Sequence, residues 1–227
     1  MRAAATAPSG IVTSNLYINL DAGQLSSYSG SGSTWTDISG NGYNGTLVNS
    51  PSYDSGNSGS IVFNGTNNSV NVSAPNPGSL PFSFEFWINP TNTTQKGTIG
   101  LYDSAPNTAY VLRGYNSVPS ESGVEWWNNN PSLSTPGLAT NTWAQVVIVY
   151  RFSTNRFIDY YRNGSFVSTA MGSTTSAYAW TNFKLGNLNG STPFYSGKLA
   201  KFAAYTKVLS AAEVLQNFNA LKSRYGL

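Results

Sequence analysis

Apolar and polar side chains alternate with a period of two along most of the chain. Leu16-Tyr17-Ile18-Asn19-Leu20 and Phe82-Ser83-Phe84-Glu85-Phe86-Trp87-Ile88 show this alternation most clearly. Successive side chains of a strand point to opposite faces, so the pattern predicts strands with one buried face. The other predicted strands are Ser60–Phe63, Ser69–Val72, Thr98–Tyr102, Tyr110–Arg113, Val124–Trp127, Trp143–Tyr150, Phe157–Arg162, Phe166–Thr169, Phe183–Leu185 and Lys198–Tyr205. Short strands at this spacing indicate an all-β fold, either a β-sandwich or a jelly roll.

Asn-Gly pairs mark several of the predicted turns. Asn163-Gly164 lies between two predicted strands, and this dipeptide tolerates the positive φ angles of a type I′ hairpin turn. Asn41-Gly42, Asn44-Gly45 and Asn64-Gly65 are also predicted as turns.

One short helix is predicted near the C-terminus. Ser210 and Glu213 have the spacing of a capping box, in which each side chain binds the other residue's backbone amide. An apolar stripe at helical spacing follows, formed by Val214, Leu215, Phe218 and Leu221. Gly226 is placed to end the helix. The stripe is typical of a helix packed on a sheet, and a helix that docks a partner protein is the alternative.

Composition then excludes several chemistries. The 227 residues contain no Cys and no His, and only 9% of them are charged. Disulfides, thiolate nucleophiles, Cys-ligated metals and Ser–His–Asp triads are therefore excluded. Ser, Thr and Asn make up about a third of the chain, while 40% hydrophobic and 14% aromatic residues suffice for a core. This balance favours a binding or structural domain over an enzyme.

The net charge of +3 arises from scattered residues, without the dense basic face that is typical of nucleic-acid binding. We therefore expect no nucleic-acid partner. The first ten residues contain no apolar signal region, and the longest apolar stretch, Val146–Tyr150, is too short to span a bilayer. We expect neither a secretory signal nor a membrane partner.

The nine carboxylates offer no convincing catalytic pair. Glycoside hydrolysis requires two carboxylates opposed across the bond. Glu121 and Glu125 are four residues apart on an extended segment, so they share a face without flanking a cleft. We predict no catalytic residues.

Calcium is the candidate ion, because carboxylate and amide oxygens suit it, and Asp21 and Asp103 are its predicted ligands. No other cofactor is predicted.

Aromatic side chains next to amides give the predicted glycan-binding site. Aromatic faces suit the C–H surfaces of sugars, and amides suit their hydroxyl groups. The predicted residues are Trp126, Trp127, Asn128, Tyr178 and Trp180. The alternative is a core role for part of this set, since one of two successive strand residues must point inward.

The opening Leu16–Gly23 and the segment Trp35–Leu47 resemble the start of concanavalin A-like, laminin-G-like jelly-roll domains. The resemblance covers about residues 14–225 and continues through Ile61–Thr66, Phe84–Ile88, Trp143–Tyr150, Asn163-Gly164, Ser196–Ala200 and Leu209–Val214. It implies two stacked antiparallel sheets, and members bind glycans, proteins or calcium, with some related hydrolases. Asn64–Ser69 replaces an acidic turn found in many relatives, which weakens the calcium inference. The acidic motif of laminarinase-like hydrolases is absent.

Within this family, the chain is similar to laminin-G-like domains in structural proteins of tailed bacteriophages. The marks are Asp21-Ala22-Gly23, the turn Ser39–Gly42 and the ending Gln216–Gly226. The resemblance implies a virion protein, assembled in the host cytoplasm, that decorates the capsid and can adhere to glycans. Implied partners are other virion proteins, host surface glycans and, as a candidate, further copies of the chain. The alternative is a receptor- or carbohydrate-binding adhesin module of a tail or fibre.

A glycoside hydrolase is a third hypothesis, which rests on fold analogy alone. The expected organisation is an N-terminal arm over 1–12 followed by one laminin-G-like domain over 13–227.

Overall fold

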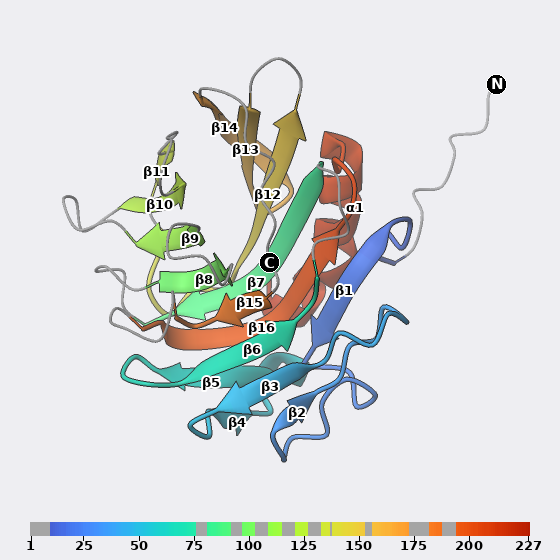
Figure 1. Ribbon diagram of the computed structural model, residues 1–227, viewed down its shortest axis with the longest axis vertical. Helices are drawn as coiled ribbons and strands as arrows, with labels where there is room; N and C mark the ends of the chain where they lie inside the picture. The colour runs from blue at the N-terminus through green and yellow to red at the C-terminus, as the bar shows by residue number, and fades with distance from the viewer. Residues whose placement is uncertain are drawn as a thin grey trace.

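Two antiparallel sheets of eight strands each form a sandwich in the computed structural model (Figure 1). The structure describes residues 10–75, 81–91, 97–102, 109–114, 121–126, 133–136, 138–152, 156–172, 182–187 and 194–227. Among these residues, no helix is both long and apolar enough to cross a membrane. The predicted fold class, an all-β sandwich with one short C-terminal helix, is confirmed.

Sheet A consists of β1 (Leu16–Asp21), β4 (Ser52–Asp54), β5 (Ser60–Asn64), β7 (Phe82–Pro90), β12 (Ala144–Phe152), β13 (Arg156–Arg162), β14 (Ser165–Gly172) and β16 (Ser196–Tyr205). Its strands follow the order β14-β13-β12-β7-β16-β5-β4, and β1 also pairs with β16. β16 therefore pairs with β7 along one side and with β5 and then β1 along the other.

Sheet B consists of β2 (Thr34–Trp35), β3 (Gly45–Val48), β6 (Ser69–Ser73), β8 (Gly97–Tyr102), β9 (Ala109–Gly114), β10 (Glu121–Trp126), β11 (Leu133–Pro136) and β15 (Asn182–Leu185). Its order is β11-β10-β9-β8-β15-β6-β3-β2. The main core lies between the sheets, where aromatic side chains from both meet. Phe84 of β7 packs edge-on against Phe183 of β15, with ring centroids 5.9 Å apart.

The outer face of sheet A is buried as well, although the alternating pattern predicts only one buried face. On β7 the intervening residues Glu85 and Trp87 are fully buried. The cover is α1 (Ala211–Leu221), followed by the 3-10 turn η2 (Lys222–Tyr225). Phe218 and Tyr225 of this cover stack on the Trp87 ring, at centroid distances of 5.9 and 4.2 Å.

A polar layer lies between sheet A and α1, centred on the Glu85 carboxylate. Trp87 Nε1, Gln145 Nε2 and Asn217 Nδ2 donate hydrogen bonds to it, at 3.1, 2.9 and 2.6 Å. The side-chain oxygen of Gln145, Oε1, accepts a hydrogen bond from the backbone N–H of Gly164 at 3.0 Å. Burial of a carboxylate requires such partners, because an unpaired charge in the interior is costly.

The capping box of α1 is confirmed, because Ser210 Oγ accepts from Glu213 N and the Glu213 carboxylate accepts from Ser210 N. The predicted apolar stripe is wrong in one position. Leu215 is 46% exposed, whereas Asn217 is fully buried. A stripe of apolar residues does not reveal Asn217, because that residue faces the polar layer and not an apolar core.

The Asn163-Gly164 turn is confirmed, since both residues have positive φ angles, of 49° and 76°. The turn predicted at Asn44-Gly45 is wrong, because Gly45 is the first residue of β3. Asn44 Oδ1 accepts from Asp37 N at 2.8 Å and so ends the preceding loop. The short strands β2, β3, β4 and β11 have no counterpart in the predicted set.

Part of the predicted N-terminal arm packs on α1. Residues 1–9 lie outside the described residues. Val12 is buried and donates its backbone N–H to Asn217 Oδ1 at 2.7 Å, while Gly10 O accepts from Gln216 Nε2 at 3.1 Å. Val12 therefore belongs to the hydrophobic cluster under α1.

Candidate functional site

Most of the predicted glycan-binding residues lie where the structure gives no description. Trp126 is the last residue of β10, of which the backbone pairing is described. Trp127, Asn128, Tyr178 and Trp180 lie outside the described residues. This glycan-binding set therefore stays a prediction.

Of the two predicted metal ligands, only Asp21 lies among the described residues. Asp103 lies outside the described residues. Asp21, at the end of β1, is buried, and its Oδ1 accepts from Arg224 Nη1 at 2.7 Å and from Gly23 N at 3.0 Å. In the described part of the chain, no three His, Cys, Asp or Glu side chains gather in a way that could hold a metal ion. Asp21 thus takes part in an ion pair that ties η2 to sheet A.

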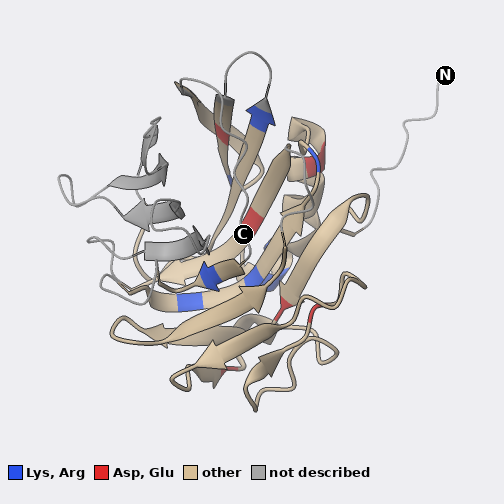
Figure 2. Cartoon of the chain, viewed as in Figure 1, with Lys and Arg blue, Asp and Glu red and all other residues tan. Residues whose placement is uncertain are grey.

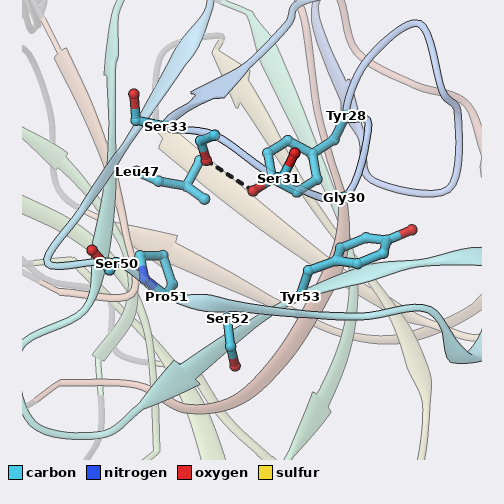
Figure 3. Close-up of a pocket in the computed structure, with 10 residues that line it drawn as sticks. Tyr28, Gly30, Ser31, Ser33, Leu47, Ser50, Pro51, Ser52 and Tyr53 are labelled. Atoms are coloured by element: carbon cyan, nitrogen blue, oxygen red, sulfur yellow. Dashed lines mark hydrogen bonds between the residues drawn. The ribbon is translucent and has the colours of Figure 1, made fainter.

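A cleft of about 380 Å³ lies where the β1–β2 loop meets β3 and β4 (Figure 3). One wall is the loop from Tyr28 to Ser33, and the other is the segment from Ser50 to Tyr53. Leu47 of β3 completes the lining and is nearly buried. Segments about 20 residues apart in sequence therefore form one concavity.

Local interactions fix the loop that forms the first wall. The Tyr28 hydroxyl donates to Gly32 O at 2.9 Å, the contact dashed in Figure 3. Ser27 Oγ donates to Thr36 O and accepts from the backbone N–H of Asp21. Gly30 has a φ of 94°, which lets its backbone lie against the Tyr53 ring, since a Cβ there would stand 3.2 Å from a ring carbon. Hydrogen bonds and close packing therefore support the shape of this wall.

The turn that leads into the second wall contains two consecutive non-glycine residues with left-handed backbone. Asn49 and Ser50 are consecutive residues with φ angles of 58° and 53°. The left-handed region costs a non-glycine residue of the order of 1 kcal/mol or more, and such residues concentrate at binding sites. Asn49 Nδ2 donates to Asn67 O at 2.8 Å, which helps to hold this conformation. Pro51 then fixes the direction in which β4 begins.

The cleft presents an apolar base with a rim of hydroxyl groups. The Tyr28 and Tyr53 rings lie 5.5 Å apart at an angle of 53°, and Leu47 and Pro51 are buried beside them. Exposed serines supply the hydroxyl groups: Ser31, Ser33, Ser50 and Ser52. Burial, and then the neighbouring Tyr53, raise the pKa of Tyr28 above its ordinary value, so this phenol stays neutral. Such a surface suits the C–H faces and hydroxyl groups of a sugar.

The residues that line the cleft include no Asp, Glu, Lys or Arg. Figure 2 shows the charged residues of the described chain spread over strands, loops and the helix. The cleft therefore offers a bound molecule hydroxyl, aromatic and backbone groups, and no carboxylate, ammonium or guanidinium group.

This cleft is not among the features that the sequence predicts. The run Tyr28-Ser29-Gly30-Ser31-Gly32-Ser33 carries the composition of a plain loop, and nothing in it indicates the second wall. Tyr53 lies in a three-residue strand that the alternating pattern does not reveal. The available signal is two tyrosines in segments rich in Ser and Gly, on either side of a predicted turn.

One family of known proteins matches the sequence of this chain. The family model described as concanavalin A-like lectin/glucanases superfamily matches residues 64–215. No curated protein has a significantly similar sequence.

Solved structures share the fold at low sequence identity. Domain 4 of AbnA, an extracellular GH43 arabinanase from Geobacillus stearothermophilus, in complex with arabinotriose, is 19% identical with a TM-score of 0.67, covering 89% of this chain and 98% of that one. The botulinum neurotoxin type G receptor-binding domain is 15% identical with a TM-score of 0.66, covering 91% and 51%. Trypanosoma rangeli sialidase in complex with sialic acid is 15% identical with a TM-score of 0.66, covering 92% and 33%. This chain thus spans about half of the toxin domain and a third of the sialidase.

Proposed function

The chain belongs to the concanavalin A-like lectin/glucanases superfamily, and from this membership we propose that it is a glycan-binding domain without catalytic activity. The observation that carries the proposal is the cleft between Tyr28 and Tyr53. It combines a tyrosine pair, an apolar base and a hydroxyl rim with a lining that contains no charged side chain.

The absence of charged side chains from the lining also indicates which sugars the cleft suits. Sialic acid carries a carboxylate, and a site for it gains most from a cationic or strongly hydrogen-bonding partner. The lining of this cleft includes no Lys or Arg. A neutral oligosaccharide is therefore the expected ligand, which is supported by the arabinotriose bound to domain 4 of the arabinanase. The volume of the cleft, about 380 Å³, lies at the lower end of the range for ligand sites, which starts at roughly 300 Å³.

The test is a glycan array that includes neutral oligosaccharides, arabinotriose among them, and bacterial surface polysaccharides. Calorimetry on the best ligand then compares three proteins: wild type, Tyr53→Ala and Tyr53→Phe. Tyr53→Ala removes the ring and is expected to weaken binding about tenfold or more, equal to about 1.4 kcal/mol. Tyr53→Phe keeps the ring and is the matched control, expected to bind within about threefold of wild type.

A fourth variant, Trp126→Ala, separates the cleft from the site that the sequence predicts. Loss of binding in Trp126→Ala with full binding in Tyr53→Ala would move the site to the tryptophan segment and refute the cleft. A wild-type protein that binds no glycan on the array would refute glycan binding altogether.

The setting that we propose for this domain is the surface of a bacteriophage particle, as an exposed decoration of the capsid or, alternatively, an adhesin of the tail or fibre. The support is the sequence resemblance of the turn Ser39–Gly42 and of the ending Gln216–Gly226 to phage structural proteins. Mass spectrometry of purified particles that carry the gene tests it. Many copies per particle are expected, and absence from particles would contradict the proposal.

A further inference from the structure

Lys201 and Asn19 meet in the buried layer on the outer face of sheet A. Both side chains are nearly inaccessible, with 1% and 6% of their surfaces exposed. The Lys201 ammonium donates a hydrogen bond to Asn19 Oδ1. The two residues come from the first and last strands of the sandwich, 182 positions apart in sequence.

The strand register explains why these side chains meet. In the antiparallel pair of β1 and β16, Asn19 lies opposite Ala203 and Asp21 lies opposite Lys201. Lys201 and Asn19 are therefore diagonal neighbours on one face of the pair. Ala203, which lies opposite Asn19, has only a methyl side chain.

Carboxylates stand on both sides of the lysine. Asp21 lies directly opposite it on β1, and β7 pairs Trp87 with Lys201 and Glu85 with the adjacent Ala203. Arg224 from η2 holds Asp21 through the 2.7 Å contact of Nη1 with Oδ1. Tyr225 covers the layer by stacking on Trp87. The lysine amine and the asparagine amide thus lie in contact in a site sealed from solvent, and the Asp21 and Glu85 carboxylates act on the amine electrostatically.

This environment differs from that of an ordinary lysine on the same strand. Lys198 pairs with the Asp54 carboxylate, and about a third of each side chain is exposed. Lys201 instead directs its ammonium at a neutral amide. Burial lowers the pKa of Lys201, although Asp21 and Glu85 act against that shift. A buried ammonium that faces a neutral partner is costly, and a covalent amide removes that charge.

We propose that Lys201 and Asn19 form an intramolecular amide cross-link between β16 and β1. A bond forms between Lys201 Nζ and Asn19 Cγ, and the bond between Cγ and Nδ2 breaks. Nζ loses two protons, which pass by way of the Asp21 carboxylate to the leaving nitrogen, and one ammonium ion departs. Atoms and charge balance without an oxidant, a metal or a cofactor.

The cross-link would close a loop through almost the whole chain. Among the described strands β1 pairs only with β16, so a single ladder of hydrogen bonds holds it in sheet A. A bond from β1 to the centre of the sheet ties both ends of the fold together. In a chain that lacks Cys, it takes the role that disulfides have in other exposed proteins.

Intact mass spectrometry of the purified full-length wild-type protein tests the proposal. The expected mass lies below the sequence mass by one ammonia molecule. Tryptic digestion is expected to give one branched peptide that joins the segment of Asn19 to the segment of Lys201. A wild-type protein with the full sequence mass, or without the branched peptide, would overturn the proposal.

Variants separate the cross-link from other losses of ammonia, such as ring closure at Asn-Gly pairs. Lys201→Met is expected to restore the full mass, whereas Lys198→Met, on the same strand, is expected to keep the deficit. A deficit that persists in Lys201→Met would contradict the assignment. If Lys201→Met fails to fold, the branched peptide of the wild type decides alone.

Asp21→Ala tests the proton transfer by the Asp21 carboxylate. This variant should accumulate at full mass, and complete cross-linking in it would remove Asp21 from the mechanism.

Discussion

Asn217 offers a direct test of the polar layer beneath α1. Its side chain makes three buried hydrogen bonds: it accepts from Val12 N at 2.7 Å and donates to Glu85 Oε2 at 2.6 Å and to the Tyr205 hydroxyl at 3.0 Å. Asn217→Ala removes all three at once. It also leaves a buried carboxylate with one donor fewer and a buried N–H without an acceptor.

The expected loss follows from these contacts. A hydrogen bond to a charged group contributes about 2 kcal/mol, and an unsatisfied buried N–H costs about 1–3 kcal/mol. The sum is a loss of about 4 kcal/mol, which is a large share of the stability of an ordinary domain. The matched control is Asn219→Ala, on the exposed side of the same helix. Both variants exchange Asn for Ala in one helix, so the gain in helix propensity cancels in the comparison.

Urea denaturation followed by tryptophan fluorescence measures this difference, because Trp87 lies in the layer itself. Asn219→Ala is expected to unfold within about 0.5 kcal/mol of wild type. A difference below about 1 kcal/mol between the two variants would refute the reasoning, because the three bonds would then contribute no more than a surface contact.

Three further predictions concern other parts of the fold. Ser210→Ala removes the N-cap of α1 and is expected to cost about 1 kcal/mol in the same urea assay. Gly164→Ala adds a Cβ at a φ of 76° and 3.0 Å from Phe218 Cδ1, so we expect a loss of about 1–2 kcal/mol in thermal unfolding. The hydrogen bond from Lys198 lowers the pKa of Asp54 below its ordinary 3.8. The interaction with Lys198 stabilises the fold fully above pH 3.8, and this stabilisation is lost as the pH falls through the lowered pKa of Asp54. In Asp54→Asn the melting temperature should therefore depend less on pH in acid than it does in the wild type.

The sequence predicts the sandwich because its local signals agree with the fold. Alternation places Phe84 and Phe86 in the core, and Asn163-Gly164 and the capping box at Ser210 have local causes that need no tertiary context. The structure therefore confirms the sequence predictions best where a residue's role depends on its near neighbours in sequence.

The remaining features depend on contacts between distant segments. Glu85 and Lys201 read as the solvent side of their strands, but α1 and η2 cover that face and make it a buried polar layer. The cleft needs Tyr28 and Tyr53 from two separate segments, one of them in a three-residue strand. No periodicity in the sequence encodes either arrangement, because each arises only when the sheets and the helix have packed.

An NMR titration of the isotope-labelled protein with the best neutral oligosaccharide of the array tests the central claim most directly. Binding in the cleft predicts that the backbone amide signals that shift most belong to the segments 28–33 and 47–53, which contain its lining residues. Saturable binding with unchanged signals in both segments would contradict the assignment of the cleft as the glycan-binding site.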